Sequence, residues 1–304
     1  MFNPWLVLSL IGLYVGLLFI VALWIERGSP QGRRFAENPW VYSFALAVYC
    51  TSWTFYGSVG SAASSGMLFL TIYLGPTLAI ILWWFGLRKL VRIKSTQRIT
   101  SIADFISARY GKSQALAAIA SMMAIIGATP YIALQLKAIL STFTLVAGSS
   151  PSTATWISDN VGPLVVVLMI IFTILFGVRR LDPTERHQGV VMALAVESVV
   201  KLIAFLAAGI FVTFFLYDGF DDLFGQLAVS PFYDMVSRGG QDVSSYLTWM
   251  SYLVLAMSAI MFLPRQFHVA VIENSNEKNI RTAMWLFPLY LFLINIFVVP
   301  IAAG

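Results

Sequence analysis

The chain has 304 residues, of which 59% are hydrophobic and 11% are charged, and its mean hydropathy is +0.82. A water-soluble domain carries about 25% charged residues, so this composition excludes a soluble globular protein and indicates a membrane protein. The net charge of +5 does not indicate nucleic acid, because the basic residues lie between apolar runs, where membrane topology accounts for them. The single cysteine, Cys50, excludes an internal disulfide and a cysteine-based metal cluster.

The apolar runs are long enough to cross a bilayer, which takes about 20 mostly apolar residues. The first run lacks the basic start and the small-residue cleavage site of a signal peptide, so it is expected to be retained. The predicted spans are 5–25, 41–63, 67–87, 114–146, 161–178, 186–217, 246–263 and 283–303. The sequence therefore predicts an all-α integral membrane protein with about eight transmembrane helices.

The charges between these spans predict the orientation of the chain. With the N-terminus outside, nearly all basic residues fall in inner loops, whereas the outer loops contain Arg238 and several aspartates. This asymmetry follows the positive-inside rule. The expected cytoplasmic loops are 26–40, 88–113, 179–185 and 264–282, and the expected extracytoplasmic loops are 147–160 and 218–245.

The second predicted span is polar in its middle. Thr51 and Ser52 follow Val41 by enough residues to lie roughly 15 Å into the membrane, close to the midplane. Polar backbone at that depth is tolerated only against protein or a water-filled cavity. Two interpretations stay open: a broken helix whose freed carbonyls and hydroxyls bind a cation or a solute, or a tight helix contact through small residues.

A short amphipathic helix is predicted between the third and fourth spans. Ser101 is a capping residue with Asp104 three positions later, and Gly111 is placed to end the helix. Because this segment is basic and expected inside, the helix should lie along the inner membrane surface.

The sixth predicted span contains Glu197 and Lys201, four residues apart in the favourable order for a helical ion pair. Two interpretations stay open here as well. The pair neutralises itself to lower the cost of burial, or it is a coupling site, because charges inside a membrane usually mark pathways.

The seventh predicted span runs into Pro264, which either marks its inner end or breaks the helix. The span that ends at this proline is the fifth after the polar second span, and an offset of five is that of an inverted five-helix repeat. Neither His187 nor His268 has metal-ligand spacing, and the sequence has no phosphate loop or nucleophile elbow. No enzymatic activity is therefore expected for this chain.

Four stretches of the sequence resemble the sodium/solute symporters and occur in that family's order. They are Trp53–Gly57 with Gly60 and Gly66, Ser101–Gly111, Pro130–Lys137 with its Tyr-x-x-x-Gln pattern, and Gly177–Met192. The resemblance implies a LeuT-type inverted-repeat fold, here partial, with an extra helix at the N-terminus. It further implies a cation site, with Na⁺ or H⁺ as the coupling ion, against the backbone carbonyls of Ala47 and Cys50. The solute-binding residues that it implies are Thr51, Ser52, Trp53 and Tyr131.

Some positions depart from the family pattern. Glu185 stands where the family has an aspartate, and Tyr49 stands where the sodium/proline symporter has a carboxylate. By the resemblance, Lys201 lies on the helix that borders the sodium site. We therefore hypothesise that its ammonium group, paired with Glu197, acts as a built-in cation. The expected coupling residues are Glu185, Glu197 and Lys201.

Two runs, 181–189 and 197–207, most resemble symporter domains fused to sensor histidine kinases. That resemblance implies recognition of an amino acid such as histidine or proline, a bacterial inner-membrane location, a C-terminal kinase domain and a response regulator. A stand-alone symporter and a ligand sensor that transports nothing are the alternatives. The sequence ends within an apolar run at Gly304, so we expect a truncated chain that lacks the later helix of the cation site.

Overall fold

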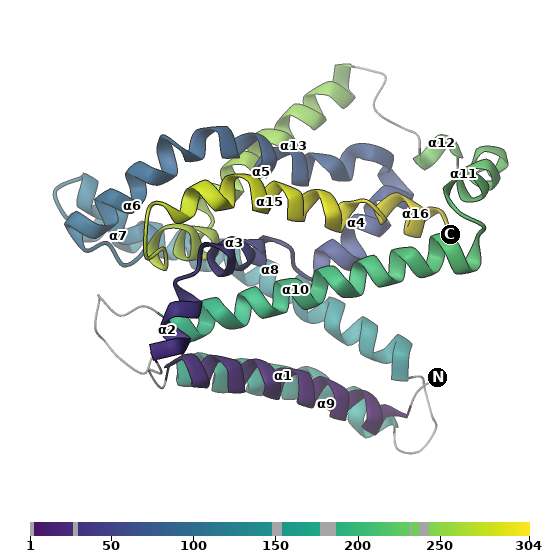
Figure 1. Cartoon of the computed structure of the whole chain (residues 1–304), viewed down its shortest axis with the longest axis horizontal. Coiled ribbons are helices and arrows are strands. Elements are labelled where there is room, and N and C mark those ends of the chain that lie inside the picture. The colour runs from purple at the N-terminus through teal and green to yellow at the C-terminus, as the bar shows by residue number, and fades with distance from the viewer. Residues whose placement is uncertain (1–2, 27–29, 148–153, 177–186, 232, 237–242) are drawn as a thin grey trace.

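The computed structural model describes residues 3–26, 30–147, 154–176, 187–231, 233–236 and 243–304, and the regular elements in these ranges are all helical (Figure 1). Each predicted span coincides with helix. The corresponding elements are α1 (Pro4–Glu26); α3 (Pro39–Leu46), η1 (Ala47–Tyr49) and α4 (Ser52–Ser65); η2 (Gly66–Leu70) and α5 (Thr71–Trp83); α8 (Gln114–Ala147); α9 (Ala154–Phe176); α10 (Gln188–Phe211) and η3 (Val212–Leu216); α13 (Val243–Phe262); and α15 (Asn279–Asn295) with α16 (Val298–Ala303).

Six helical runs among the described residues are long and apolar enough to cross a membrane. They are Trp5–Glu26, Ser52–Trp83, Gln114–Val146, Gln188–Leu216, Ser245–Phe262 and Asn279–Ala303. They do not match the eight predicted spans one for one. The run Ser52–Trp83 joins span 67–87 to the part of span 41–63 that follows the interruption at Cys50. Helix α9, at the position of span 161–178, contributes only the shorter apolar stretch Gly162–Ile171. The chain is thus an all-α, multi-pass membrane protein.

The predicted loops contain helices of their own. These are α2 (Pro30–Ala36), α6 (Gly86–Gln97), α7 (Ile102–Arg109), α11 (Phe220–Val229), α12 (Tyr233–Val236), α14 (Pro264–Phe267) and η4 (His268–Ile272). The short helix predicted after the third span is confirmed as α7: the Ser101 hydroxyl accepts a hydrogen bond from the Asp104 amide at 3.1 Å, and Gly111 has a φ of +66°. The backbone of Gly111 is in the left-handed region that favours glycine after a helix end.

The segment predicted as an inner loop at 264–282 is largely buried. Gln266, Phe267, Val271 and Asn274 are each at most 1% exposed. The proline at 264 ends α13 and starts the short helix α14, which η4 then continues. A segment that reads as a charged connection in the sequence therefore folds back into the protein core.

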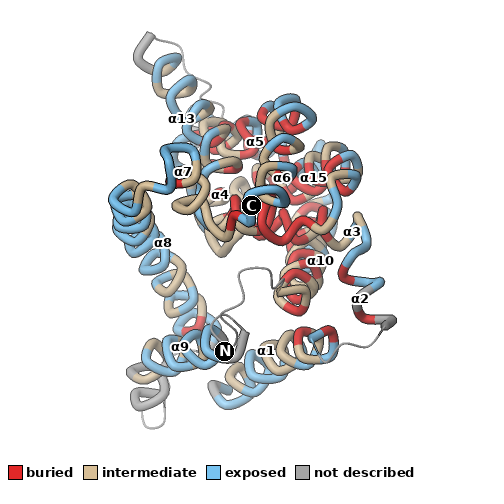
Figure 2. Tube along the Cα trace, turned by 90° about the vertical axis from the view of Figure 1, so that its left-hand side faces the viewer, coloured by how far each residue is buried: buried red, intermediate tan, exposed pale blue. Residues whose placement is uncertain are grey.

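The core lies where α3, α5, α10 and α15 meet. Helix α15 packs against α3 and α5, α10 packs against α3, and the rings of Trp83 and Phe287 stack at 5.6 Å between α5 and α15. Figure 2 shows the buried residues gathered in this region, whereas α8 is exposed along most of its length. The first half of the interrupted second span, α3, packs against α10 and α15 of this core, whereas its second half, α4, contacts α8.

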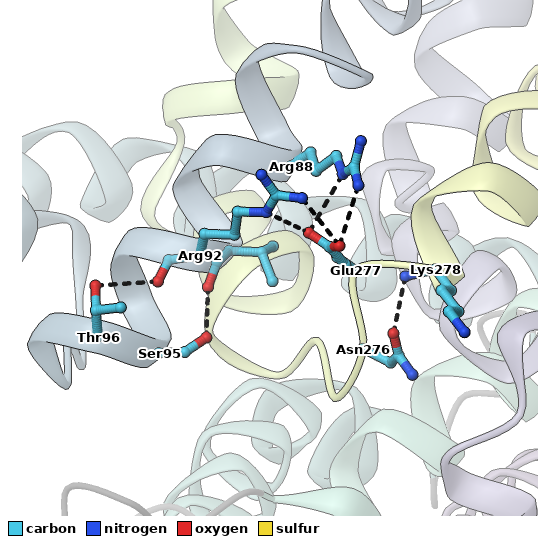
Figure 3. A network of polar contacts seen from close by, with 8 residues as sticks. Arg88, Arg92, Ser95, Thr96, Asn276, Glu277 and Lys278 are labelled. Atoms are coloured by element: carbon cyan, nitrogen blue, oxygen red, sulfur yellow. Dashed lines mark hydrogen bonds and ion pairs between the residues drawn. The ribbon is translucent and has the colours of Figure 1, made fainter.

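An acidic residue joins α6 to the segment that precedes α15 (Figure 3). The Glu277 carboxylate accepts hydrogen bonds from Arg92 Nε at 2.6 Å and from Arg88 Nη2 at 3.2 Å, and each guanidinium makes a second bond to it. These hydrogen bonds, that of Arg92 first, lower the pKa of Glu277 to about 2. The segment that follows η4 is thereby tied to the basic helix α6.

A close contact between α5 and α13 generates a first prediction. A Cβ atom on Gly75 of α5 would lie 2.5 Å from Ala256 Cβ and 2.9 Å from the Leu253 carbonyl oxygen, both on α13. We expect Gly75→Ala to lower stability by about 1–3 kcal/mol through overpacking, measured by thermal melting in detergent. Gly127→Ala on α8 is the control, because no atom lies within 4 Å of its Cβ position. Equal melting temperatures for the two variants would contradict the close approach of α5 and α13.

A second prediction concerns pH. Because the pKa of Glu277 is lower in the folded chain than the ordinary value of 4.5, its contribution to stability is complete above pH 4.5 and is lost as the pH falls towards about 2. Glu277→Gln should therefore melt below the wild-type protein at neutral pH, and the difference should shrink on acidification below pH 4.5. The control is Glu37→Gln, which removes an exposed carboxylate between α2 and α3. A difference in melting temperature that stays constant down to pH 3 would contradict the stabilising role of the ion pairs between Glu277 and the two arginines.

Candidate functional site

The second span is a broken helix. The η1 turn ends at Tyr49, the backbones of Cys50 (φ −80°, ψ 108°) and Thr51 (φ −110°, ψ −167°) are extended, and α4 begins at Ser52. The structure thus confirms the broken helix of the first interpretation, whereas binding of a cation or a solute by its freed groups stays a prediction. The break puts a helix C-terminal end and a helix N-terminal end next to each other, each with backbone groups that lack a partner inside the helix.

A lysine meets the C-terminal end of the break. Lys201 Nζ on α10 donates a hydrogen bond of 2.7 Å to the Cys50 carbonyl oxygen and pairs with Glu197 Oε1 at 3.0 Å. The Ala47 carbonyl oxygen accepts the Cys50 amide at 2.9 Å. Both carbonyls that the family resemblance assigns to a cation therefore have partners within the chain, and one of these partners is itself a cation.

Side chains from α8 meet the N-terminal end of the break. The Thr51 hydroxyl is 3.0 Å from the Tyr131 hydroxyl, and the Ser52 hydroxyl donates to Gln135 Oε1. Tyr131 and Gln135 are four residues apart, so they lie on the same face of α8. The hydroxyl of Thr51 does not cap α4, and the Thr51 carbonyl accepts the Thr54 amide at 2.9 Å, which leaves the amides of Ser52 and Trp53 for another acceptor.

The break at Pro264 lies close to the same point. Arg265 Nη2 donates a hydrogen bond of 3.4 Å to the Tyr131 hydroxyl, and its guanidinium carbon lies 5.2 Å from the centre of the Tyr131 ring. A second tie runs from the Tyr42 hydroxyl on α3 to the Ala270 carbonyl in η4 at 2.8 Å. The two interrupted segments are thus connected, although more than two hundred residues separate Tyr42 from Ala270 in the chain.

The structure brings most of the sequence-predicted residues to this break. Ala47, Cys50, Thr51 and Ser52 form it, and Tyr131, Glu197 and Lys201 reach it or its partners. Trp53 is half-buried and lies over Gly57 of its own helix, where a Cβ atom on Gly57 would meet the indole. Glu185 lies outside the described residues. The roles of all these side chains stay predictions.

Sequence reasoning missed the roles of Gln135 and Arg265. Gln135 is part of the Tyr-x-x-x-Gln pattern and follows Tyr131 by one helical turn, so the sequence did indicate that the two side chains share a helix face. For Arg265, which follows Pro264, the sequence indicated no partner. It also missed Glu273, which accepts a hydrogen bond from the His187 amide at 3.0 Å and lies 3.1 Å from His268 Nε2. In the part of the chain that the structure describes, no cluster of three or more histidine, cysteine or acidic side chains could hold a metal ion.

A groove of about 900 Å³ lies elsewhere, between α5, α6, α7 and α13. None of the predicted site residues lines it. Its lining includes Leu82, Phe85 and Phe262, which are 56%, 78% and 58% exposed. Large apolar side chains with this exposure are typical of a surface that faces lipid, so the groove is separate from the break.

Comparison with known proteins identifies the family. The sequence profile of the Sodium:solute symporter family matches residues 32–302. The chain is 25% identical over 283 residues to "Uncharacterized symporter YhjB" of Bacillus subtilis (strain 168), a match that covers 92% of this chain and 53% of that relative. It is 30% identical over 125 residues to "Uncharacterized symporter YodF" of the same strain, covering 41% of this chain and 25% of the relative.

The chain thus spans about half the length of YhjB, and no solved structure matches it. The description of the family names sodium and a solute as the pair that its members carry. Because the profile covers nearly the whole sequence, the chain belongs to the sodium:solute symporter family.

Proposed function

We propose that the chain recognises a small amino acid at the break between η1 and α4, as the solute-binding module of a transporter. The observation that carries the proposal is the meeting of the α4 N-terminus with Arg265 through Tyr131. A helix N-terminus carries roughly half a positive elementary charge, and the first amides of α4 have no side-chain cap. A carboxylate is the group that such an end and a guanidinium recognise together.

The same place offers neutral hydrogen-bonding groups for the rest of the solute. Thr51 and Ser52 contribute hydroxyls, and Gln135 Nε2 is buried without a hydrogen-bond partner among the described residues. A buried donor of this kind is stable when a bound acceptor satisfies it. The family resemblance suggests an amino acid such as proline or histidine, and these two are the first probes.

The position of the break supports movement of the solute as well as binding. Secondary transporters place their sites at interrupted helices near the membrane midplane, where one repeat rocks against the other. Here the site joins α4, α8 and α14, which belong to both halves of the predicted repeat. The proposal places the protein in the bacterial inner membrane with the N-terminus outside, where the positive-inside rule puts the basic loops in the cytoplasm.

The third prediction tests the site with radiolabelled proline and histidine bound to the full-length protein in nanodiscs. Thr51→Val should weaken binding of the recognised amino acid about 2- to 10-fold, because it removes a hydroxyl where water does not replace it. Thr77→Val is the matched control, since the Thr77 hydroxyl bonds to the Tyr73 carbonyl within α5 at 2.8 Å. Arg265→Gln should weaken binding more than Thr51→Val does. The carboxamide derivative of the amino acid should compete poorly with the radiolabelled amino acid. Unchanged affinity in Thr51→Val removes Thr51 from the site, and equal competition by the amide contradicts carboxylate recognition.

We further propose that this module feeds a sensor histidine kinase, which then phosphorylates a response regulator. Runs 181–189 and 197–207 support this through their resemblance to kinase-fused symporter domains. As the fourth prediction, membranes that contain the native gene product and radiolabelled ATP should show histidine phosphorylation that changes with the amino acid. Vesicle uptake without phosphorylation would leave a stand-alone symporter, and binding with phosphorylation but without uptake would leave a sensor that transports nothing.

A further inference from the structure

Lys201 is a charged residue inside a strongly apolar helix. The run Gln188–Leu216 that contains it includes an 18-residue stretch with a mean hydropathy of 2.5, and the Lys201 side chain is 15% exposed. A charge at such a position is costly unless it has partners, and charges kept there usually serve a function. The partners of this ammonium group are one carboxylate, Glu197, and one backbone carbonyl, Cys50.

The Cys50 carbonyl is a place where a cation is stabilised for physical reasons. It stands at the C-terminal end of α3 and η1, which carries roughly half a negative elementary charge and has carbonyls without helical partners. Cys50 is 0% exposed, so bulk water does not reach it. In interrupted membrane helices, such ends coordinate the coupling cation of a transporter.

Lys201 supplies this end with a covalently held positive charge. Its Nζ atom is 2.7 Å from the Cys50 oxygen, which is within the distance of a strong charge-assisted hydrogen bond. Glu197, one helical turn away on α10, balances the charge at 3.0 Å. Tyr14 of α1 and Tyr290 of α15 are near enough to Glu197 to interact with its charge. The position is therefore filled and charge-balanced, with the Lys201 side chain 15% exposed and the Glu197 side chain 35% exposed.

A sodium ion does not fit beside this arrangement. An ion bound at the Cys50 carbonyl would displace the ammonium group or face it as a like charge at a few ångströms. Arg265 brings a second positive charge whose field reaches Cys50. The residues present thus disagree with the sodium ion that the family implies at this end of the break.

We propose that the Lys201 ammonium group is the resident cation of the first break and takes the place of a dissociable sodium ion in this protein. The inference deepens the proposed function, on which it rests for its role in transport, because it states how the cation position of the solute site is filled. Solute recognition then needs no sodium at this position, and Glu197 is a positioning residue that holds the ammonium group against the carbonyl.

The test compares the melting temperature of the purified full-length protein in sodium chloride and in choline chloride at equal ionic strength. The wild-type protein should melt at the same temperature in both salts. Lys201→Ala should melt about 5 °C or more lower in choline chloride, because a buried carbonyl and a carboxylate lose their partner. Sodium or methylammonium chloride should restore most of that loss by supplying a small cation.

The control is Lys137→Ala, which removes an exposed lysine from α8 and should melt alike in every salt. If Lys201→Ala does not yield folded protein, Lys201→Ser takes its place, since its short side chain also leaves room for a small cation at the carbonyl. Stabilisation of the wild-type protein by sodium over choline overturns the proposal, and so does a Lys201 variant that no small cation restores.

A second measurement applies once proline or histidine is found to bind. The affinity of the wild-type protein should change less than twofold when choline replaces sodium, whereas a tenfold loss would overturn the proposal. The melting experiment needs neither solute nor transport, so its failure is distinguishable from a failure of the proposed function.

Discussion

Peptide groups inside a bilayer have no water to bond with, so a helix can be interrupted there only where other parts of the protein satisfy the freed backbone. The break at Cys50 and Thr51 meets this condition at the end of η1, where Lys201 of α10 bonds to the Cys50 carbonyl. At the start of α4, the Tyr131 hydroxyl of α8 lies 3.0 Å from the Thr51 hydroxyl, and Arg265 of α14 contacts Tyr131. Side chains of α8, α10 and α14 thus meet around the break.

The two ends of the break differ in charge, and the side chains beside them differ accordingly. The negative end of η1 faces an ammonium group, whereas the positive end of α4 is left without a side-chain cap and faces neutral hydroxyls and an amide. This difference in charge is the basis of both proposals, recognition of an anionic group at the start of α4 and a resident ammonium group at the end of η1.

Much of this arrangement follows from the sequence, and the parts that do not have an identifiable cause. Hydropathy located the spans because a helix must hide its backbone over a fixed thickness, and the Ser, Thr and Gly content of 41–66 located the break. Glu197 and Lys201 were paired by helical spacing alone. The partners of Gln135 and Arg265 lie 83 and 134 residues away in the chain, and no local pattern encodes such contacts. The burial of 264–274 was missed because its charged neighbours indicated a surface loop.

A cryo-electron microscopy map of the full-length protein in sodium-containing nanodiscs, with side chains resolved, tests the central claim most directly. The account predicts a helix interrupted between Tyr49 and Ser52, with the Lys201 side chain on the Cys50 carbonyl and no separate ion between them. A continuous helix through this stretch would contradict the break. Ion density at the Cys50 carbonyl with Lys201 turned away would show that sodium, and not the lysine, occupies the cation position.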